Sequence, residues 1–314
     1  MIGTSPATYA PEAVRKSLQG RQRDIKGFAF RAGLLAALLV TVALLAVLIS
    51  DVVSGGWSVL STRPIDFLTG SLSSSAATAG IGQGLRGTFF IAVFVVLVAF
   101  PVGVGAAIYL EEYAPHTRFT RLIDVNIRNL AGVPSVVYGI LGFAIFVKAL
   151  GAFTGPNANG RTVISAGLTL AILVLPIVII TSAEAVRAVP DSLREAGFGV
   201  GATRWEVIRS HVLPYAGPGI LTGTVLALAR ALGEAAPLIL VGATTGFLSG
   251  GDSYRLTSLQ DKFTAMPMII YNWAGRPQPG FKAATAAAIV ILLAVVLMAN
   301  ATAILLRNRY EKRR

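Results

Sequence analysis

The sequence predicts an all-α integral membrane protein with about six transmembrane helices. Its 314 residues are 54% hydrophobic and only 13% charged, whereas soluble domains carry about 25% charged residues. Lys and Arg gather beside the apolar stretches rather than on one face of an element. Six stretches also reach the length of roughly 17–25 residues that a helix needs to cross a bilayer. They are Phe28–Val53, Thr88–Leu110, Leu130–Leu150, Val163–Glu184, Gly217–Ala243 and Ala283–Leu306.

Three of the spans have features that are unusual for a transmembrane helix. The first, Phe28–Val53, is too long for the apolar region of a secretory signal and lacks a convincing cleavage site, so we expect it to be retained. Gly and Pro interrupt the third span, and Pro176 lies inside the fourth. Such residues are tolerated in membrane bundles, where neighbouring helices satisfy the freed backbone groups.

The distribution of Lys and Arg predicts the orientation. Residues 1–31, 111–129, 185–216 and 307–314 hold 18 of them, and the opposite loops 51–86, 148–161 and 252–282 hold 8. The richer side faces the cytoplasm, so both termini are expected there. The basic tail is interpreted as an anchor beside anionic lipid rather than a nucleic-acid site.

Two external segments stand out by composition. Ser71–Gly84 is rich in Ser, Ala and Gly and is typical of a flexible loop. The longer loop Thr244–Lys282 mixes aromatic and polar residues. Around Met266–Trp273 it forms either a re-entrant or interfacial element or an ordinary loop packed on the bundle.

The cytoplasmic loop at 190–214 has the signals of two short helices. Ser192 and Glu195 have the spacing of a capping box, and Thr203 and Glu206 repeat it. Three glycines between the two boxes can end the first helix and form a tight turn. Pro214 is expected to bound the second helix.

Two short helices at an angle, with Trp205 at the turn, suit insertion into a groove on another protein. Two other interpretations remain. The loop could be a connection that contacts nothing, or a helix-turn-helix DNA reader, although tethering between two membrane spans makes duplex access poor.

The same loop resembles the EAA loop of ABC importer permeases. From Glu195 it reads E-A-G-x-x-x-G, then nine residues, then H-x-L-P; the family pattern is E-A-A-x-x-x-G, nine residues, I-x-L-P. Gly197 and His211 depart from that pattern. The resemblance implies that the loop, with Trp205 at its turn, couples to a cytoplasmic ATPase. The residues that match are Glu195, Ala196, Gly201, Leu213 and Pro214.

Two charges, Arg230 and Glu234, lie inside the fifth apolar stretch. A charge at the centre of a membrane helix costs about 2.5–3.5 kcal/mol on insertion scales, so both should face a partner helix or a wet cavity. Four residues apart, they share a helical face and can pair. They are either an ion pair that holds the bundle together or part of a solute path, in which the arginine fork suits an oxyanion. The residues leave the identity of the anion open.

Three segments resemble phosphate-importer permeases. RALGEAAPL, from Arg230, is similar to the R-A-x-G-E-T-A-P-L segment of the PstA type, with Ala235 in place of threonine. The sister PstC type usually lacks the A-P-L. NLAGVPSVVYG (Asn129–Gly139) and IYNWAGRP (Ile270–Pro277) resemble two further signatures. The glycines of NLAGVPSVVYG, Gly132 and Gly139, also suit close helix packing.

The resemblance runs from about Leu85 to the C-terminus and implies an ABC importer type I permease fold in the bacterial cytoplasmic membrane. It divides the chain into a cytoplasmic segment 1–27, a first helix and external loop 28–84, a permease core 85–306 and a basic tail 307–314. It implies phosphate as the solute, Arg230 and Glu234 as transport residues, and three kinds of partner. These are a PstC-type second permease, two copies of a PstB-type ATPase and a secreted PstS-type phosphate-binding protein.

The sequence lacks the motifs of an enzyme. It contains no Gly-Lys dipeptide and therefore no Walker A loop, so we expect ATP-Mg on the partner ATPase and no cofactor on this chain. There is no cysteine, and H-E-x-x-H and G-x-S-x-G are absent. The two histidines, His116 and His211, fall in loops, and we expect no metal site.

Three alternatives to a phosphate permease remain. One is a permease for another small oxyanion, sulfate or molybdate. The second is a membrane-embedded enzyme, for which only Arg230 and Glu234 could serve, without a nucleophile and adjacent base. The third is a signalling subunit without transport.

Overall fold

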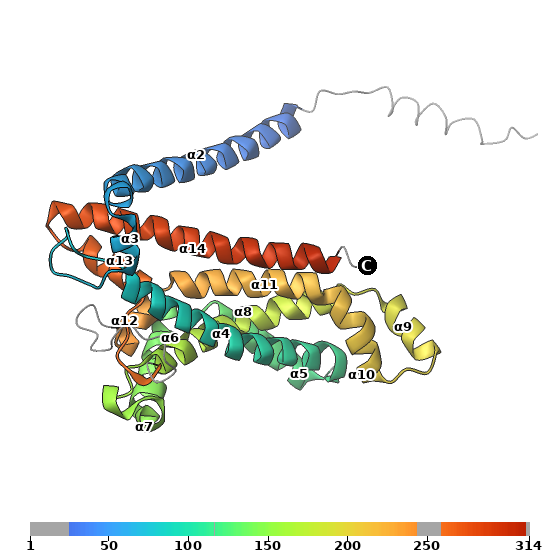
Figure 1. Cartoon of the computed structure of the whole chain (residues 1–314). Coiled ribbons are helices and arrows are strands. Elements are labelled where there is room, and N and C mark those ends of the chain that lie inside the picture. The colour runs from blue at the N-terminus through green and yellow to red at the C-terminus, as the bar shows by residue number, and fades with distance from the viewer. Residues whose placement is uncertain (1–24, 116, 244–258, 312–314) are drawn as a thin grey trace, which may run out of the picture. The chain divides into compact units, whose positions relative to one another are not determined.

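The structure, a computed structural model, describes residues 25–115, 117–243 and 259–311. These residues form helices and their connections without a β-strand, which confirms the predicted all-α class. The chain divides into two units, Met1–Asp51 and Val52–Arg314. The described part of the first unit is the beginning of α2 (Figure 1). Most of the predicted N-terminal segment 1–27, His116, the loop portion 244–258 and the tail residues 312–314 lie outside the described residues.

The helices follow one another with short connections. In chain order they are α2 (Ile25–Thr62), α3 (Pro64–Thr69), α4 (Gly82–Ile108), η2 (Tyr109–Tyr113), α5 (Arg118–Ala131), α6 (Ser135–Gly142), η3 (Phe143–Ala149), α7 (Gly151–Thr154), η4 (Pro156–Ala158), α8 (Val163–Arg187), α9 (Asp191–Gly199), α10 (Arg204–Val207), η5 (Ile208–Val212), α11 (Leu213–Gly233), α12 (Ala236–Val241), α13 (Met266–Ala274) and α14 (Pro279–Glu311).

Five of the described helices are long and apolar enough to cross a membrane. They are Lys26–Thr62, Gly82–Tyr113, Val163–Arg187, Arg204–Gly233 and Pro279–Arg309. A sixth candidate is a helix pair, Arg118–Ala131 with Ser135–Ala149, which passes the same test but is bent by 100°. The prediction of about six spans is therefore confirmed, with one of them broken.

The third predicted span is not the continuous helix expected over Leu130–Leu150. Leu130 belongs to the last turn of α5, and α6 begins only at Ser135. Pro134 lies at the break because its ring removes a backbone donor and disfavours a helical conformation for the residue before it. The Tyr138 hydroxyl donates a 2.8 Å hydrogen bond to the Leu130 carbonyl and thereby ties the two arms of the bend together.

The fifth predicted span, Gly217–Ala243, is also wrong as one helix. It ends at Gly233, and a separate helix, α12, begins at Ala236. The fourth span behaves differently, because α8 continues past Pro176 to Arg187. Proline therefore does not decide alone where a membrane helix breaks.

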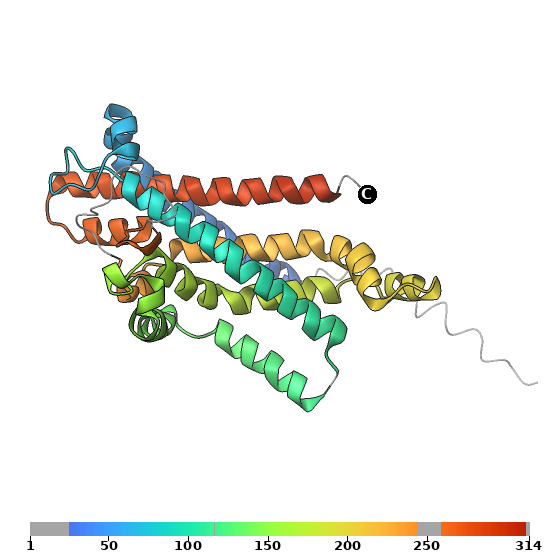
Figure 2. The same ribbon diagram turned by 60° about the horizontal axis from the view of Figure 1, so that its bottom comes forward.

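Helix α8 is at the centre of the larger core and packs along α4 and α11 (Figures 1 and 2). Its Leu170, Val174 and Val178 side chains are buried, and buried residues occur on several faces around the helix. A helix that is apolar all round belongs in the interior of a bundle. Close approach depends on small residues, since a Cβ at Gly103 of α4 would lie 2.6 Å from Val178 Cγ1.

Replacing Gly103 with leucine is expected to destabilise the chain by about 1–3 kcal/mol, because the side chain would overpack the contact with α8. The matched control is Gly105→Leu on the same helix, where a Cβ would have no atom within 4 Å. Both changes alter helix propensity equally. The measurement is the temperature at which the purified chain in detergent loses its monodisperse elution peak. Equal loss in both variants would contradict close α4–α8 packing.

A second core lies where α3, α13 and the beginning of α14 meet. It buries Phe67, Trp273 and Phe281, with the ring centroids of Trp273 and Phe281 5.6 Å apart. The last turns of α2 join this core within the second unit, since a Cβ at Gly56 would lie 2.6 Å from the Ala287 amide nitrogen. The segment Met266–Trp273 is therefore helical and packed on α14 and α4.

The segment Ser71–Gly84 is held in place, contrary to the prediction of a flexible loop. The Arg63 guanidinium donates hydrogen bonds to the carbonyls of Ala76 and Ala79, the latter at 3.1 Å. Backbone bonds close the loop as well, from Gly80 N to Ser71 O at 2.9 Å. Arg63, which lies outside the loop, therefore provides hydrogen bonds that fix the backbone of this segment.

Candidate functional site

The two predicted transport residues pair across a helix break. Arg230 lies in the last turn of α11, and Glu234 is the extended residue that caps it. Arg230 Nε lies 3.5 Å from Glu234 Oε1, and the side chains are 42% and 19% exposed. The C-terminal end of a helix carries partial negative charge, which favours a cation there. The pairing inferred from the i, i+4 spacing is thus present.

The pair lies at the end of α11 and not, as predicted, within one continuous helix. Arg230 lies near the far end of α11, which begins at Leu213, so its Cα is about 25 Å along the helix from the end of the loop 190–214. The break between Glu234 and Ala236 leaves backbone groups without helical partners. Within a membrane such backbone is tolerated only where protein buries it or where it lines a water-filled cavity.

The NLAGVPSVVYG and RALGEAAPL segments lie side by side. A Cβ at Gly139 would lie 2.8 Å from Pro237 Cα and 2.7 Å from Leu240 Cδ1, so α6 and α12 approach closely. The buried Tyr138 is within electrostatic range of Arg230. The packing role expected of Gly139 is confirmed, whereas Gly132 contacts only its own turn, where a Cβ would lie 3.5 Å from the Asn129 carbonyl oxygen. Two distant stretches of sequence thus meet near Arg230.

The third segment, IYNWAGRP, belongs to the second core instead. Trp273 is buried there, and the Arg276 guanidinium lies 4.3 Å from the centre of the Phe281 ring. Arg276 Nε also donates to Asn272 Oδ1 at 3.3 Å. This arginine therefore has a packing role.

The loop 190–214 forms α9 and α10, as expected, but with one capping box rather than two. At the first, Pro190 occupies the N-cap position without a side-chain cap, so Ser192 lies inside the helix and the predicted box is wrong. At the second, Thr203 N donates to Glu206 Oε2 at 2.7 Å, and Glu206 N to Thr203 Oγ1 at 3.4 Å. The hydrogen bonds from the Thr203 amide and hydroxyl hold the pKa of the Glu206 carboxyl below its usual range.

Glycine is required at two positions where α9 meets α10, one in the turn and one inside α9. Gly201 has φ +83°, a conformation that other L residues rarely adopt. A Cβ at Gly197 would lie 2.8 Å from Val207 Cγ2. The departure from the E-A-A pattern at Gly197 therefore lets α9 cross close over α10.

The loop exposes three large apolar side chains. Phe198, Val200 and Trp205 are exposed, by 85% at Val200, and Glu195 and Ala196 are exposed as well. Leu213 is half-buried. Pro214 does not bound the second helix, because the chain runs as one helix from Arg204 to Gly233 through the wide π-helical turn η5. Such a turn is one of the irregularities that accommodate a proline inside a helix.

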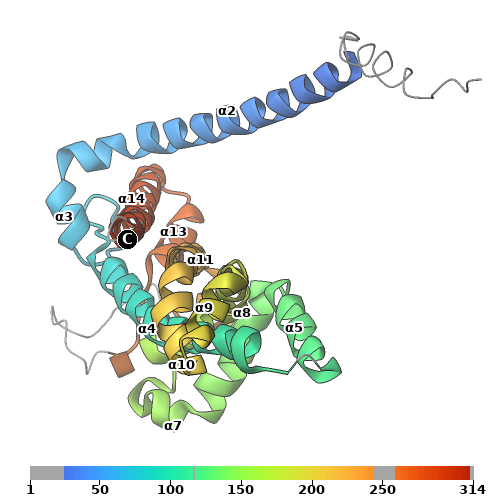
Figure 3. The same ribbon diagram turned by 90° about the vertical axis from the view of Figure 1, so that its right-hand side faces the viewer.

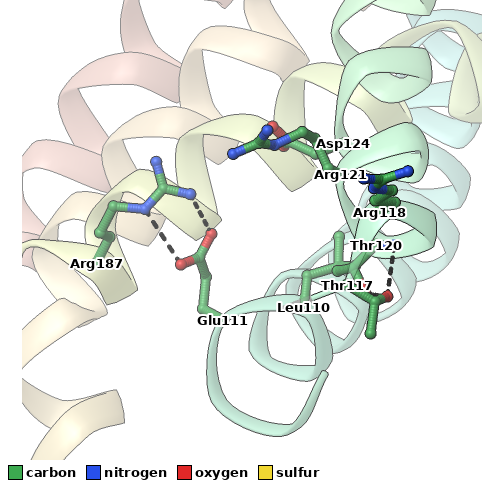
Figure 4. Close-up of a pocket in the computed structure, with 8 residues that line it drawn as sticks. All are labelled: Leu110, Glu111, Thr117, Arg118, Thr120, Arg121, Asp124 and Arg187. Atoms are coloured by element: carbon green, nitrogen blue, oxygen red, sulfur yellow. Dashed lines mark hydrogen bonds and ion pairs between the residues drawn. The ribbon is translucent and has the colours of Figure 1, made fainter. Parts of the chain in front are cut away.

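A pocket of about 520 Å³ opens between η2, the beginning of α5 and the end of α8 (Figure 4). Three of its charged side chains are already paired: Arg187 and Glu111 bind each other, and Asp124 binds Arg128, which does not line the pocket. Glu112, the neighbour of Glu111, was not predicted as a functional residue. The signal for it was its place in an acidic pair at the predicted cytoplasmic end of a span, where basic residues are the rule. The pocket is lined by Leu110, Glu111, Thr117, Arg118, Thr120, Arg121, Asp124 and Arg187.

No group of three His, Asp or Glu side chains that could hold a metal ion occurs in the ranges that the structure describes.

Comparison with known proteins places this arrangement among transport proteins. Residues 99–312 match the family model described as binding-protein-dependent transport system inner membrane component. The phosphate transport system permease protein PstA 1 of Mycobacterium tuberculosis is 31% identical over 315 residues, which is 98% of this chain and 95% of that protein. The phosphate transport system permease protein PstC of Mesorhizobium japonicum is 34% identical over 256 residues, 73% of this chain and 76% of that one.

A solved structure supports the same fold. A chain in the crystal structure of a bacterial ABC transporter involved in the import of the acidic polysaccharide alginate superimposes with a TM-score of 0.61 at 18% identity, over 88% of this chain and 97% of that chain. The expected permease fold is thereby confirmed.

Proposed function

This chain belongs to the family of binding-protein-dependent transport system inner membrane components, and we propose that it is the PstA-type permease subunit of an ATP-driven importer of inorganic phosphate. It is a transport subunit rather than an enzyme. Relatives named as PstA and PstC phosphate permeases support phosphate as the solute. The full-length match to a PstA protein, together with the A-P-L sequence after Glu234, favours the PstA type.

The observation that carries the proposal is the Arg230–Glu234 pair at the break between α11 and α12. An arginine fork matches two oxygens of a phosphate. Its exposure of 42% leaves it reachable although Glu234 contacts it. In the proposed path, Arg230 attracts the anion and Glu234 positions the guanidinium.

We further propose that the loop 190–214 docks on the partner ATPase. The exposed side chains Phe198, Val200 and Trp205 form a surface that can enter a groove, and Glu195, Ala196, Gly201, Leu213 and Pro214 set its shape. ATP-Mg binds to two copies of that PstB-type ATPase, and this chain binds no cofactor.

The remaining partners are a PstC-type second permease and an extracytoplasmic PstS-type phosphate-binding protein. Helices α9 and α10 lie at the same end of the second unit as the C-terminal end of α14 (Figure 3), which carries Arg307 and Arg309. This gathering of basic residues supports a cytoplasmic location of that end in the bacterial membrane.

The reconstituted importer tests the choice of solute. We expect inorganic phosphate, presented by its binding protein, to stimulate ATP hydrolysis several-fold, with sulfate and molybdate leaving it at the basal rate. The complex is assembled from the four kinds of subunit in proteoliposomes, and each anion is tested with its own binding protein. Stimulation by sulfate or molybdate alone would reassign the solute, and no stimulation by any anion would contradict the importer.

A further inference from the structure

The end of α4 carries two consecutive carboxylates that bind different elements. Both belong to the π-helical turn η2. Glu111 accepts hydrogen bonds from Arg187 at the end of α8, with Arg187 Nε 3.2 Å from Glu111 Oε2 (Figure 4). Glu112 accepts from Arg194, which lies 82 residues further along the chain in α9. The turn thus connects the membrane helix α4 to both α8 and the docking loop.

All three guanidinium nitrogens of Arg194 donate hydrogen bonds at this junction. Its Nη2 lies 2.9 Å and its Nε 3.1 Å from Glu112 Oε1. Its two terminal nitrogens also reach backbone carbonyls at the end of α8 and just after it, Val189 O at 2.7 Å from Nη1 and Val186 O at 3.0 Å from Nη2. Nη1 also donates to Asp191 Oδ1 at 3.0 Å. One side chain therefore holds α9 to η2 and to the end of α8 together.

The two ion pairs differ in their surroundings. The Arg194 and Glu112 side chains are 17% and 9% exposed, and the adjacent core contains Val186, Val189 and the half-buried Leu193. In the other pair, Glu111 is 18% exposed but Arg187 is 56% exposed. Water screens exposed pairs, whereas removing one member of a buried pair leaves a charge without compensation.

We propose that the Glu112–Arg194 pair is the positioning link through which movement of the docking loop reaches α4 and α8. This inference rests on the proposed function, because it assigns the path of the ATPase stroke. A buried pair with this many hydrogen bonds keeps α9 fixed on η2. Helix α4 packs along α8 and α11, so a displacement of α9 shifts the helices around Arg230. Arg194 and Glu112 are positioning residues and do not contact the solute.

The test measures phosphate uptake and ATP hydrolysis together in proteoliposomes that contain the whole importer. Glu112→Gln and Arg194→Gln are each expected to lower the phosphate transported per ATP hydrolysed by about tenfold or more. The matched controls, Glu111→Gln and Arg187→Gln, remove the more exposed pair and are expected to change that ratio by less than about twofold.

Two further variants separate coupling from folding. If the two residues act as one unit, the double variant Glu112→Gln/Arg194→Gln loses no more coupling than the worse single variant. Arg194→Lys keeps the charge but not the fork, and it should give an intermediate ratio in a complex that still contains the ATPase.

Two results would overturn the inference, provided that the unmodified complex transports phosphate. One is the same amount of phosphate transported per ATP in Glu112→Gln as in Glu111→Gln, and the other is full coupling in Arg194→Lys. Failure of the unmodified complex to couple ATP hydrolysis to phosphate would instead contradict the proposed function.

Discussion

Replacing Arg230 with glutamine is expected to lower phosphate uptake by about ten- to a hundredfold. A hydrogen bond to a charged group contributes about 1.5–3 kcal/mol, and each 1.4 kcal/mol is a factor of about ten. Glutamine keeps a donor near the same place but removes the charge and the fork. The measurement is uptake of radiolabelled phosphate in cells that lack their own phosphate importers, with the amount of protein in the membrane followed by immunoblot.

The double variant Arg230→Gln/Glu234→Gln separates anion attraction from damage to the pair. Arg230→Gln alone leaves the Glu234 carboxylate, 19% exposed, without its cation. If that uncompensated charge caused the loss, the double variant would recover uptake; if the anion needs the guanidinium, the double variant stays inactive. Arg276→Gln is the control for loss of an arginine, since Arg276 packs on Phe281 in the other core. Normal uptake by Arg230→Gln would remove this residue from the path.

Replacing Gly201 with valine is expected to lower the amount of ATPase that co-purifies with the permease by at least about fivefold. At φ +83° a β-branched residue is strained, and such strain costs on the order of 1–3 kcal/mol. The turn opens, and the capping box that begins two residues later loses its orientation. The measurement is the ratio of ATPase to permease after affinity purification of the co-expressed complex.

Gly199→Val is the matched control for that experiment. Gly199 is exposed, has no neighbouring atom within 4 Å of a Cβ, and does not have positive φ. We expect this variant to retain the ATPase. Loss in both variants would mean that any larger side chain in the turn blocks the partner, and retention in both would mean that the turn geometry is not needed for docking.

Local sequence features were sufficient to predict that about six segments can cross the membrane, that residues 190–214 form two short helices, and that Arg230 and Glu234 pair. Apolar length decides whether a helix can cross a bilayer, and i, i+4 spacing brings two side chains onto one face without knowledge of any other element. The Thr203–Glu206 capping box is local in the same way and was predicted correctly. The Ser192–Glu195 box, with identical spacing, did not form, because α9 begins at Asp191 with Pro190 as its N-cap, which places Ser192 inside the helix.

The helix breaks depended on packing that the sequence does not display. Pro134 breaks a helix, whereas Pro176 and Pro214 lie inside continuous ones. Helix α11 ends at Gly233, four residues before Pro237, whose ring would clash with the Gly233 carbonyl in a continuous helix. Whether freed backbone groups find partners depends on neighbouring helices.

The link between Glu112 and Arg194 was likewise beyond prediction from spacing. Their contact joins residues 82 positions apart, and only the packing of α4 against α8 brings the end of one helix beside the loop that follows the other. Composition and periodicity thus determine which segments cross the membrane and which residues share a face. The tertiary structure decides where those helices break and which charges meet, because both depend on contacts between segments that are distant in the chain.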